Sequence, residues 1–182
     1  MNDARNTCGQ AYALTVMTPI LDGHESALTH YLSTLQPGPA SPLEGVAGTH
    51  FARWVVIGDV VYEGHGQRPD HLKRGRLLFT SNFDGPLTPY IERLRTGLGE
   101  VADAIWGHCG GYPGSGEASA FAAYMRSHQI ESSLFFSAYG ERTVEYVRRS
   151  LITRRRLIDF VLSTQGLAAP ELQAAFRETF TA

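Results

Sequence analysis

The chain has 182 residues, of which 43% are apolar and 19% are charged, and its formal net charge is −2. This length suits one domain with a buried core, or one domain with an extension. The near-balanced charge predicts no nucleic-acid or membrane partner, and no apolar run reaches the roughly 18 residues of a membrane-spanning helix. Two cysteines are too few for a disulfide framework, so we expect a reducing, cytoplasmic setting.

The first half of the chain predicts three strands and one helix. Residues 1–10 are polar and are expected to be loose. Residues 11–20 are β-branched and apolar, which favours a strand, and residues 22–35 place apolar side chains at helical spacing. Two further apolar segments, 48–62 and 76–85, are predicted to be strands joined by a polar connection.

The second half predicts helices around one more strand. A helix begins at Pro86, and Gly97 or Gly99 is expected to divide it. After the glycine-rich loop "DAIWGHCGGYPGSG" (103–116), the pattern predicts a helix over 117–129, a strand over 132–140, and helices over 141–166 and 169–180.

This order of elements predicts the fold class α+β, with a ferredoxin-like split βαβ arrangement. The expected architecture is a four-stranded antiparallel sheet with helices on one face. The domain would span residues 11–166, followed by a helical extension over 167–182. Strand 48–62 is apolar on both sides, with Phe51 and Val55 on one face and Trp54 on the other. Because the second face also needs cover, we expect a homodimer.

The core strands "HFARWVVI", "RLLFTSNFDG" and "SLFFSAYG" and the order of elements resemble the dimeric α/β-barrel superfamily. This group includes small monooxygenases, chlorite-dismutase-like proteins and dye-decolourising peroxidases. The resemblance covers roughly residues 10–165 as a pattern, with no motif of a single member. It implies two sheets packed face to face around a cavity for a substrate or haem. Because such proteins carry unrelated chemistries, the scaffold names no reaction.

The strand "THFARW" (49–54) carries the first candidate site residues. Alternation places His50 and Ala52 on one face and Phe51 and Arg53 on the other. An arginine in an apolar strand needs solvent, a carboxylate or a ligand anion. If the strands pair with Arg53 near Thr80, then Arg53, Thr80 and Asn82 share a face and form a substrate-binding patch. The alternative is an edge arginine in a surface ion pair.

The segment "SNFDG" (81–85) offers Asp84 as a catalytic candidate. Dye-decolourising peroxidases carry a Gly-x-x-Asp-Gly motif whose aspartate assists peroxide cleavage, and Asp84 and Gly85 resemble its end. Ser81 stands where that motif has its first glycine. The structural alternative is that Asp84 and Gly85 end the strand and cap the next helix.

The glycine-rich loop offers His108, Cys109 and Tyr112. It lacks the second histidine or Cys-x-x-Cys of a metal site, and it lacks the Gly-Lys-Ser/Thr of a phosphate-binding loop. A haem ligated by His108 or Cys109 remains open beside a purely structural turn. So do His108 as a catalytic group and Cys109 and Tyr112 as substrate contacts. A thiol-dependent enzyme using Cys109 is a further alternative.

Two other segments carry weaker signals. His65 and His71 lie in a polar connection without an evident third metal ligand. The arginine-rich stretch 147–157 interleaves with apolar residues, which predicts a solvated or interface face of a helix rather than a nucleic-acid site.

Two function classes follow. The first is a small-molecule enzyme with oxidative, monooxygenase-like or peroxidase-like chemistry, acting on a small organic substrate in the barrel. It would use either haem or no cofactor at all, and His50, His108 and Asp84 would be its catalytic candidates. The second is a non-catalytic ligand-binding or assembly module with the same fold.

Overall fold

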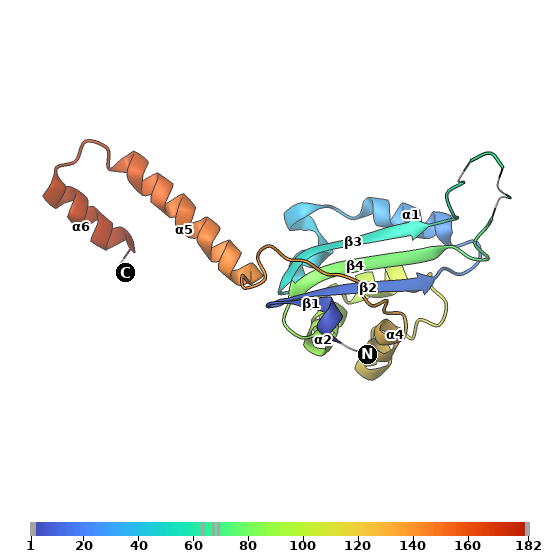
Figure 1. Cartoon of the computed structure of the whole chain (residues 1–182). Coiled ribbons are helices and arrows are strands. Elements are labelled where there is room, and N and C mark those ends of the chain that lie inside the picture. Colours follow the sequence, from blue (N-terminus) through green and yellow to red (C-terminus); the bar gives the residue numbers. More distant parts are fainter. Residues whose placement is uncertain (1–2, 63, 67, 69, 181–182) are drawn as a thin grey trace. The chain divides into compact units, whose positions relative to one another are not determined.

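The computed structural model describes residues 3–62, 64–66, 68 and 70–180 (Figure 1). The chain divides into two compact units, residues 1–143 and residues 144–182. The sequence analysis expected the C-terminal extension to begin at residue 167, whereas the second unit begins at residue 144. Met1 and Asn2, which begin the segment expected to be loose, and the last two residues of the expected extension lie outside the described residues.

The first unit is α+β and contains one antiparallel sheet with the strand order β1-β2-β4-β3. Its strands are β1 (Thr7–Cys8), β2 (Ala11–Pro19), β3 (Thr49–Ile57) and β4 (Arg76–Asp84). The three long strands confirm the sequence prediction within a few residues at their ends. The sheet and its helices fit a ferredoxin-like fold.

The helices of this unit pack against one face of the sheet, as expected (Figure 1). They are α1 (Glu25–Thr34), α2 (Leu87–Leu98), α3 (Glu100–Trp106) and α4 (Ala118–Ser127). Short 3-10 turns occupy Asp3–Asn6, Gly38–Ala40 and Pro42–Gly45. Gly99, with a φ of 49°, separates α2 from α3, because only glycine adopts this backbone conformation readily. None of the helices in the described residues is both long enough and apolar enough to cross a membrane.

The central strand β4 alternates strictly between the two faces of the sheet. Leu77, Phe79, Ser81 and Phe83 are at most 1% exposed and point into the core beneath the helices. The intervening side chains point to the other face, which we call the open face. It is formed by the outward residues of the three long strands, among them Ala13, Thr15, Met17, Phe51, Arg53, Val55, Leu78, Thr80 and Asn82.

The predicted fourth strand over 132–140 is wrong, since this segment is irregular in the structure. The free edge of β2 already has partners. β1 pairs with its first residues, while Gln129 bridges to Val16 and the Ile130 amide donates to the Thr15 carbonyl. No stretch of this edge is left for a nine-residue strand. The apolar side chains of the segment are therefore exposed, among them Leu134 (88%), Phe136 (78%) and Tyr139 (75%).

The N-terminal segment is ordered from Asp3 onward, contrary to the expectation that it is loose. Asn6 is fully buried, and its side-chain oxygen accepts a hydrogen bond of 2.8 Å from the Ser132 amide. The Tyr12 hydroxyl accepts from the Gln129 side chain at 3.0 Å and from the Asn6 side chain at 3.4 Å. This buried polar cluster ties the segment to β2 because each of its members gains a hydrogen-bond partner.

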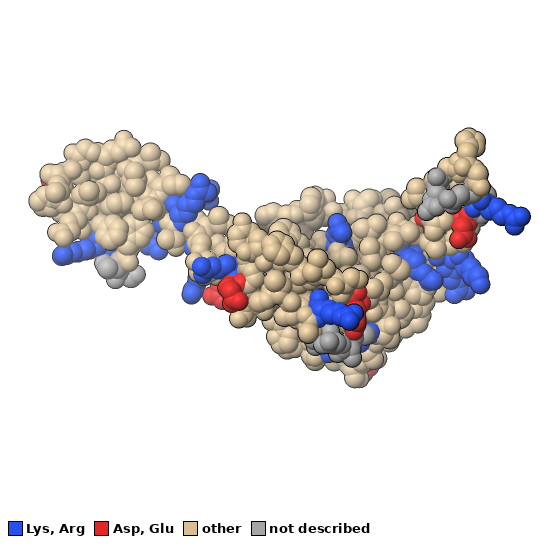
Figure 2. All heavy atoms as spheres, in the orientation of Figure 1, with Lys and Arg blue, Asp and Glu red and all other residues tan. Residues whose placement is uncertain are grey.

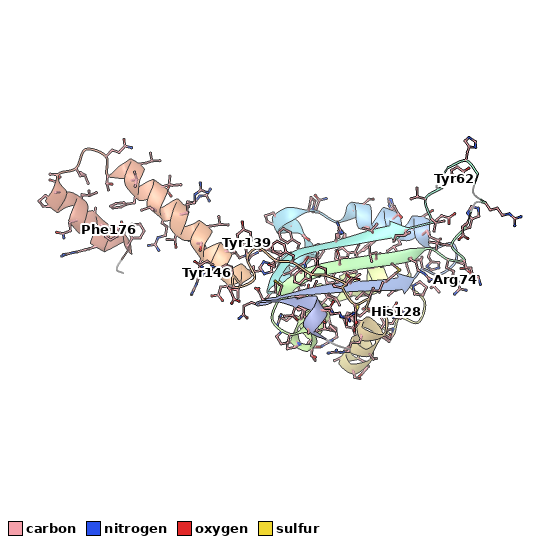
Figure 3. All side chains as sticks on the ribbon, viewed as in Figure 1. Tyr62, Arg74, His128, Tyr139, Tyr146 and Phe176 are labelled. Carbon is pink, nitrogen blue, oxygen red and sulfur yellow. The ribbon has the colours of Figure 1, made fainter. Side chains whose placement is uncertain are left out.

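The second unit consists of two helices, α5 (Val144–Ser163) and α6 (Ala169–Phe180), which confirm the two predicted C-terminal helices. Phe160, Phe176 and Phe180 form a cluster with ring centroids 4.9–5.8 Å apart, and Figure 3 shows Phe176 between the two helices. Arg156 donates a 2.6 Å hydrogen bond to the Thr179 carbonyl. No residue in the described part of either helix is buried.

The core predicts a large difference between two neighbouring residues of β4. Phe79 packs against Trp54 and Trp106, so Phe79→Ala is expected to lower the free energy of unfolding by about 3–5 kcal/mol. Leu78→Ala, on the open face, is the matched control and is expected to cost about 1 kcal/mol. Urea unfolding followed by fluorescence measures both values, and equal losses would contradict the assignment of faces.

Candidate functional site

A depression on the open face is the candidate site. Its volume is ≈ 480 Å³, which lies in the range of small-molecule sites. The lining residues come from all three long strands and are Ala13, Leu14, Thr15, Phe51, Ala52, Arg53, Thr80, Ser81 and Asn82. The depression thus combines an aromatic ring, one cation and several hydrogen-bonding groups on a rigid sheet.

Arg53 and Thr80 are directly opposite each other in the ladder between β3 and β4, so the expected register is confirmed. The Arg53 Nε–H donates a hydrogen bond of 3.2 Å to the Thr80 hydroxyl. Asn82 lies one pair further along the same face, opposite Phe51. The hydrogen bond to Thr80 uses one edge of the guanidinium, and its terminal N–H groups suit a carboxylate or another planar anion.

His50 and Asp84 form a pair where β3 begins and β4 ends. The His50 Nε2 and Asp84 Oδ1 atoms are 2.8 Å apart, and both side chains are largely buried. The ladder shifts register between Thr49 and Phe51, so His50 is an extra residue and does not simply share the face of Ala52 as alternation predicted. This β-bulge lets the imidazole reach the carboxylate.

The pair is close to the depression along the strand. Asp84 follows Asn82 by two residues on the same side of β4, a separation of about 7 Å between their Cα atoms. With Nε2–H donating to Asp84, the His50 Nδ1 atom carries the lone pair and can accept a proton. A carboxylate that orients an imidazole in this way is a common acid–base arrangement.

The glycine-rich loop lies elsewhere, at the end of β2. Ile20 bridges to Cys109, and the Leu21 amide donates to the His108 carbonyl. Cys109 is 3% exposed, and its Sγ accepts a hydrogen bond of 3.2 Å from the Thr18 hydroxyl on the helix-covered side. Burial raises the pKa of the Cys109 thiol, and the hydrogen bond from Thr18 offsets part of this effect. The structure therefore does not bring Cys109 to the depression that holds Arg53.

Tyr112 has a structural environment. Its hydroxyl donates to Asp103 at 2.8 Å, and its ring packs edge-on against Phe121 and Tyr124 of α4. Asp103 also accepts from the Ser115 amide and hydroxyl, each at 2.7 Å. Burial raises the pKa of the Asp103 carboxyl, but the three hydrogen bonds outweigh burial and the net shift is downward. Asp103 thus holds the glycine-rich loop closed, as the structural alternative supposed.

No pattern in the sequence predicted the contact between His24 and His108. Their Nδ1 atoms are 3.0 Å apart, so one imidazole donates and the other accepts. Burial, and secondarily the nearby His24, lower the pKa of His108, which favours the neutral ring. Residues 84 positions apart meet here, and no local pattern predicts such a contact. Within the described ranges no three His, Cys, Asp or Glu residues are grouped as metal ligands.

One histidine of the polar connection, His71, has a carboxylate partner. The His71 Nδ1 atom is 2.6 Å from Asp59 Oδ2. The hydrogen bond to His71 lowers the pKa of Asp59 to about 2, with the Leu72 and Val60 amides adding to the effect. This exposed ion pair accounts for His71 without a metal.

The residues of the open face do not fit a haem ligated by His108 or Cys109. Cys109 is buried on the opposite side of the sheet, and His108 lies at the end of β2 beside His24 and does not line the depression. His50 is the histidine near the depression, and its Nε2 atom is held by Asp84. No haem-dependent step is therefore assigned to these residues.

A second, larger groove of ≈ 830 Å³ runs between α1 and the edge of β3. Its lining includes Glu25 and His30 of α1 and Trp54 and Val56 of β3. The ionisable groups come from α1 only, and they lie along its exposed side. We favour the depression on the open face, because there groups from three strands converge on one point.

In comparisons with known proteins, the chain matches no family model, no curated protein and no solved structure.

The surroundings of the two cysteines predict very different reactivity. Cys109 is buried with a raised pKa, whereas Cys8 is partly exposed. Because the thiolate is the reactive form, iodoacetamide at pH 7.5 is expected to label Cys8 at least about tenfold faster than Cys109. Peptide mass spectrometry measures both rates, and labelling in guanidinium chloride is the control in which they converge. Fast labelling of Cys109 in the folded protein would support the alternative that the protein is a thiol-dependent enzyme.

Proposed function

We propose that the protein is a small-molecule enzyme whose substrate, a small organic anion, binds on the open face between two copies of the chain. Arg53, Thr80 and Asn82 bind the substrate, and the His50–Asp84 pair transfers a proton. The reaction class is oxidative, monooxygenase-like or peroxidase-like, as the resemblance to the dimeric α/β-barrel superfamily implies, and dioxygen or a peroxide would be the co-substrate that accepts the electrons of the substrate.

The observation that carries this proposal is the position of Arg53. Its guanidinium is fixed by the hydrogen bond to Thr80 and lines the depression together with apolar and uncharged polar side chains. Arg53 is exposed in the single chain; once a second copy covers the open face, its guanidinium would lose hydration and an anionic ligand would compensate this loss. The side chain of Phe51, which is 77% exposed, offers a flat apolar surface beside it. An aromatic or other planar carboxylate matches both groups.

A second copy of the chain is part of the proposal, since the depression lies open on one side. Small-molecule sites usually enclose most of the ligand surface. Phe51 and Val55 (39% exposed) project from β3 on the same face, and covering them with an identical sheet would remove apolar surface from water. The cover would also exclude water from Arg53, which strengthens its attraction for an anion.

The acid–base role belongs to His50. Asp84 holds the Nε2–H tautomer, so that Nδ1 accepts a proton from the bound substrate and the carboxylate stabilises the resulting imidazolium. Removal of a proton makes an organic substrate more electron-rich and easier to oxidise. His108, Cys109 and Tyr112 take no part in this proposal, because their contacts are at the end of β2 and on α4.

A ligand-binding module without catalysis is the second candidate function. The depression itself is lined by Arg53, Phe51 and small polar side chains, and none of these is a strong base or nucleophile near neutral pH. The two candidates share the ligand site and differ only in the role of His50.

Ligand binding is tested with benzoate as the probe. Titration is followed by the NMR shifts of the Thr80 and Asn82 amides, and Arg53→Gln is expected to weaken binding on the order of tenfold, the loss typical of one charge-assisted hydrogen bond. Arg76→Gln is the matched control, because Arg76 lies on the same face at the far end of β4. Equal effects of the two substitutions would contradict a site at Arg53.

The same titration separates the enzyme from the binding module. His50→Gln is expected to leave the affinity for benzoate within about twofold, since His50 does not line the depression. If a substrate is turned over, His50→Gln is expected to lower its kcat roughly 100-fold or more. Turnover that is unchanged in His50→Gln would leave only the binding module.

The dimer is tested by light scattering after size exclusion. The full chain is expected to run at twice the monomer mass, and Phe51→Asp is expected to shift it to the monomer, because a charge would be buried in the interface. Tyr62→Asp is the control for an exposed aromatic residue in the connection between β3 and β4, beyond the end of the sheet. A wild-type protein that remains monomeric at high micromolar concentration would contradict the dimer.

A further inference from the structure

The charge of the chain is divided unequally between its two units. Residues 144–182 carry six arginines and four acidic residues, whereas residues 1–143 carry ten basic and fourteen acidic residues. The second unit therefore has a net charge of +2 and the first of −4. The overall value of −2, which predicts no membrane or nucleic-acid partner, hides a basic segment of 39 residues.

α5 carries apolar side chains on the side of α6 and on the opposite side, and Leu157 and Val161 lie between the two. One face contacts α6 through Phe160 and Arg156. The other is a stripe formed by Val147, Leu151, Ile158 and Leu162, whose spacings of four, seven and four residues confine them to about 60° of arc. The centre of the stripe lies about 170° around the helix from Phe160. α6 therefore packs on the side opposite to the stripe.

The stripe is exposed and flanked by arginines. The exposed fractions of its four side chains are 41%, 57%, 46% and 64% along the chain. At 100° per residue, Arg154 and Arg155 each lie about 20° outside its two edges, and both are exposed. Figure 2 shows basic side chains over α5, with most of the neighbouring surface neither basic nor acidic.

We propose that the stripe on α5 lies on an anionic lipid surface, with its apolar side chains in the headgroup boundary and its arginines at the lipid phosphates. A helix with an apolar face, low overall hydrophobicity and arginines at the edges of that face is suited to lie in a membrane interface. Arginine stems can cover apolar surface while the guanidinium reaches the phosphates. The helix lies on the membrane and does not cross it.

Charge decides between this partner and the alternatives. Pairing of α5 with α5 of a second copy would bring together two helices that each carry five arginines and two acidic residues. In the antiparallel register that matches the stripes, Arg154 would face its own counterpart, which is repulsive. Nucleic acid would satisfy the arginines and leave Val147, Leu151, Ile158 and Leu162 in water. An anionic lipid surface accommodates both the charge and the stripe.

The full chain is tested by cosedimentation with vesicles at 50 mM salt. We expect binding to vesicles of phosphatidylglycerol and phosphatidylcholine in equal amounts, and at least tenfold weaker binding to pure phosphatidylcholine. The double substitution Arg154→Gln with Arg155→Gln is expected to lower the partition coefficient roughly 25-fold, at about fivefold for each arginine. Arg68→Gln with Arg74→Gln, in the first unit, changes the charge equally and is expected to have little effect.

A second pair of variants isolates the stripe. Leu151→Gln is expected to weaken binding on the order of tenfold. Ile152→Gln is the matched control, because Ile152 is similarly exposed (61%) but lies outside the stripe, and circular dichroism checks that both variants keep their helices. Equal effects of the two substitutions, or equal binding to both kinds of vesicle, would overturn the proposal. So would a change of oligomeric state in Leu151→Gln without a change in vesicle binding, which would make the stripe a contact between copies.

Discussion

The hydrogen bonding of β4 on both of its edges, to β2 and to β3, is the constraint on which the rest of the first unit depends. A strand paired on both sides cannot shift register without moving every side chain to the opposite face. Phe79 and Phe83 are thereby fixed in the core, and Thr80 and Asn82 are fixed on the open face. The candidate site is thus a direct consequence of the burial pattern of one strand.

The same constraint explains how much could be predicted from the sequence. The pairing of Arg53 with Thr80 followed from strand alternation and one assumed register between the two strands, and it was predicted correctly. The segment 132–140 has the composition of a strand, but hydrogen bonding depends on an available edge, and residues 7–8 and 129–130 occupy the edge of β2. The composition of a segment indicates its preference for the strand conformation, whereas pairing requires a strand edge that no other part of the chain already occupies.

For the individual site residues too, the local sequence indicated the candidates, but their contacts depend on distant parts of the chain. Asp84 was a candidate because Asp84 and Gly85 resemble the end of a peroxidase motif, and His50 because of its place in a strand. Their contact depends on one extra residue between Thr49 and Phe51. His108 and Cys109 were candidates because they stand together in a glycine-rich loop. Their actual partners, His24 and Thr18, come from distant parts of the sequence, and no spacing rule reaches so far.

The β-bulge at His50 has a consequence for how such a protein can change over time. Deletion of one residue there would restore uninterrupted alternation in β3 and separate the imidazole from Asp84, while the register from Phe51 to Ile57 would stay as it is. The groups that hold a ligand and the group that moves a proton are therefore encoded in separable stretches of the same strand. A lineage could lose or acquire acid–base chemistry by a single codon without rebuilding its recognition surface.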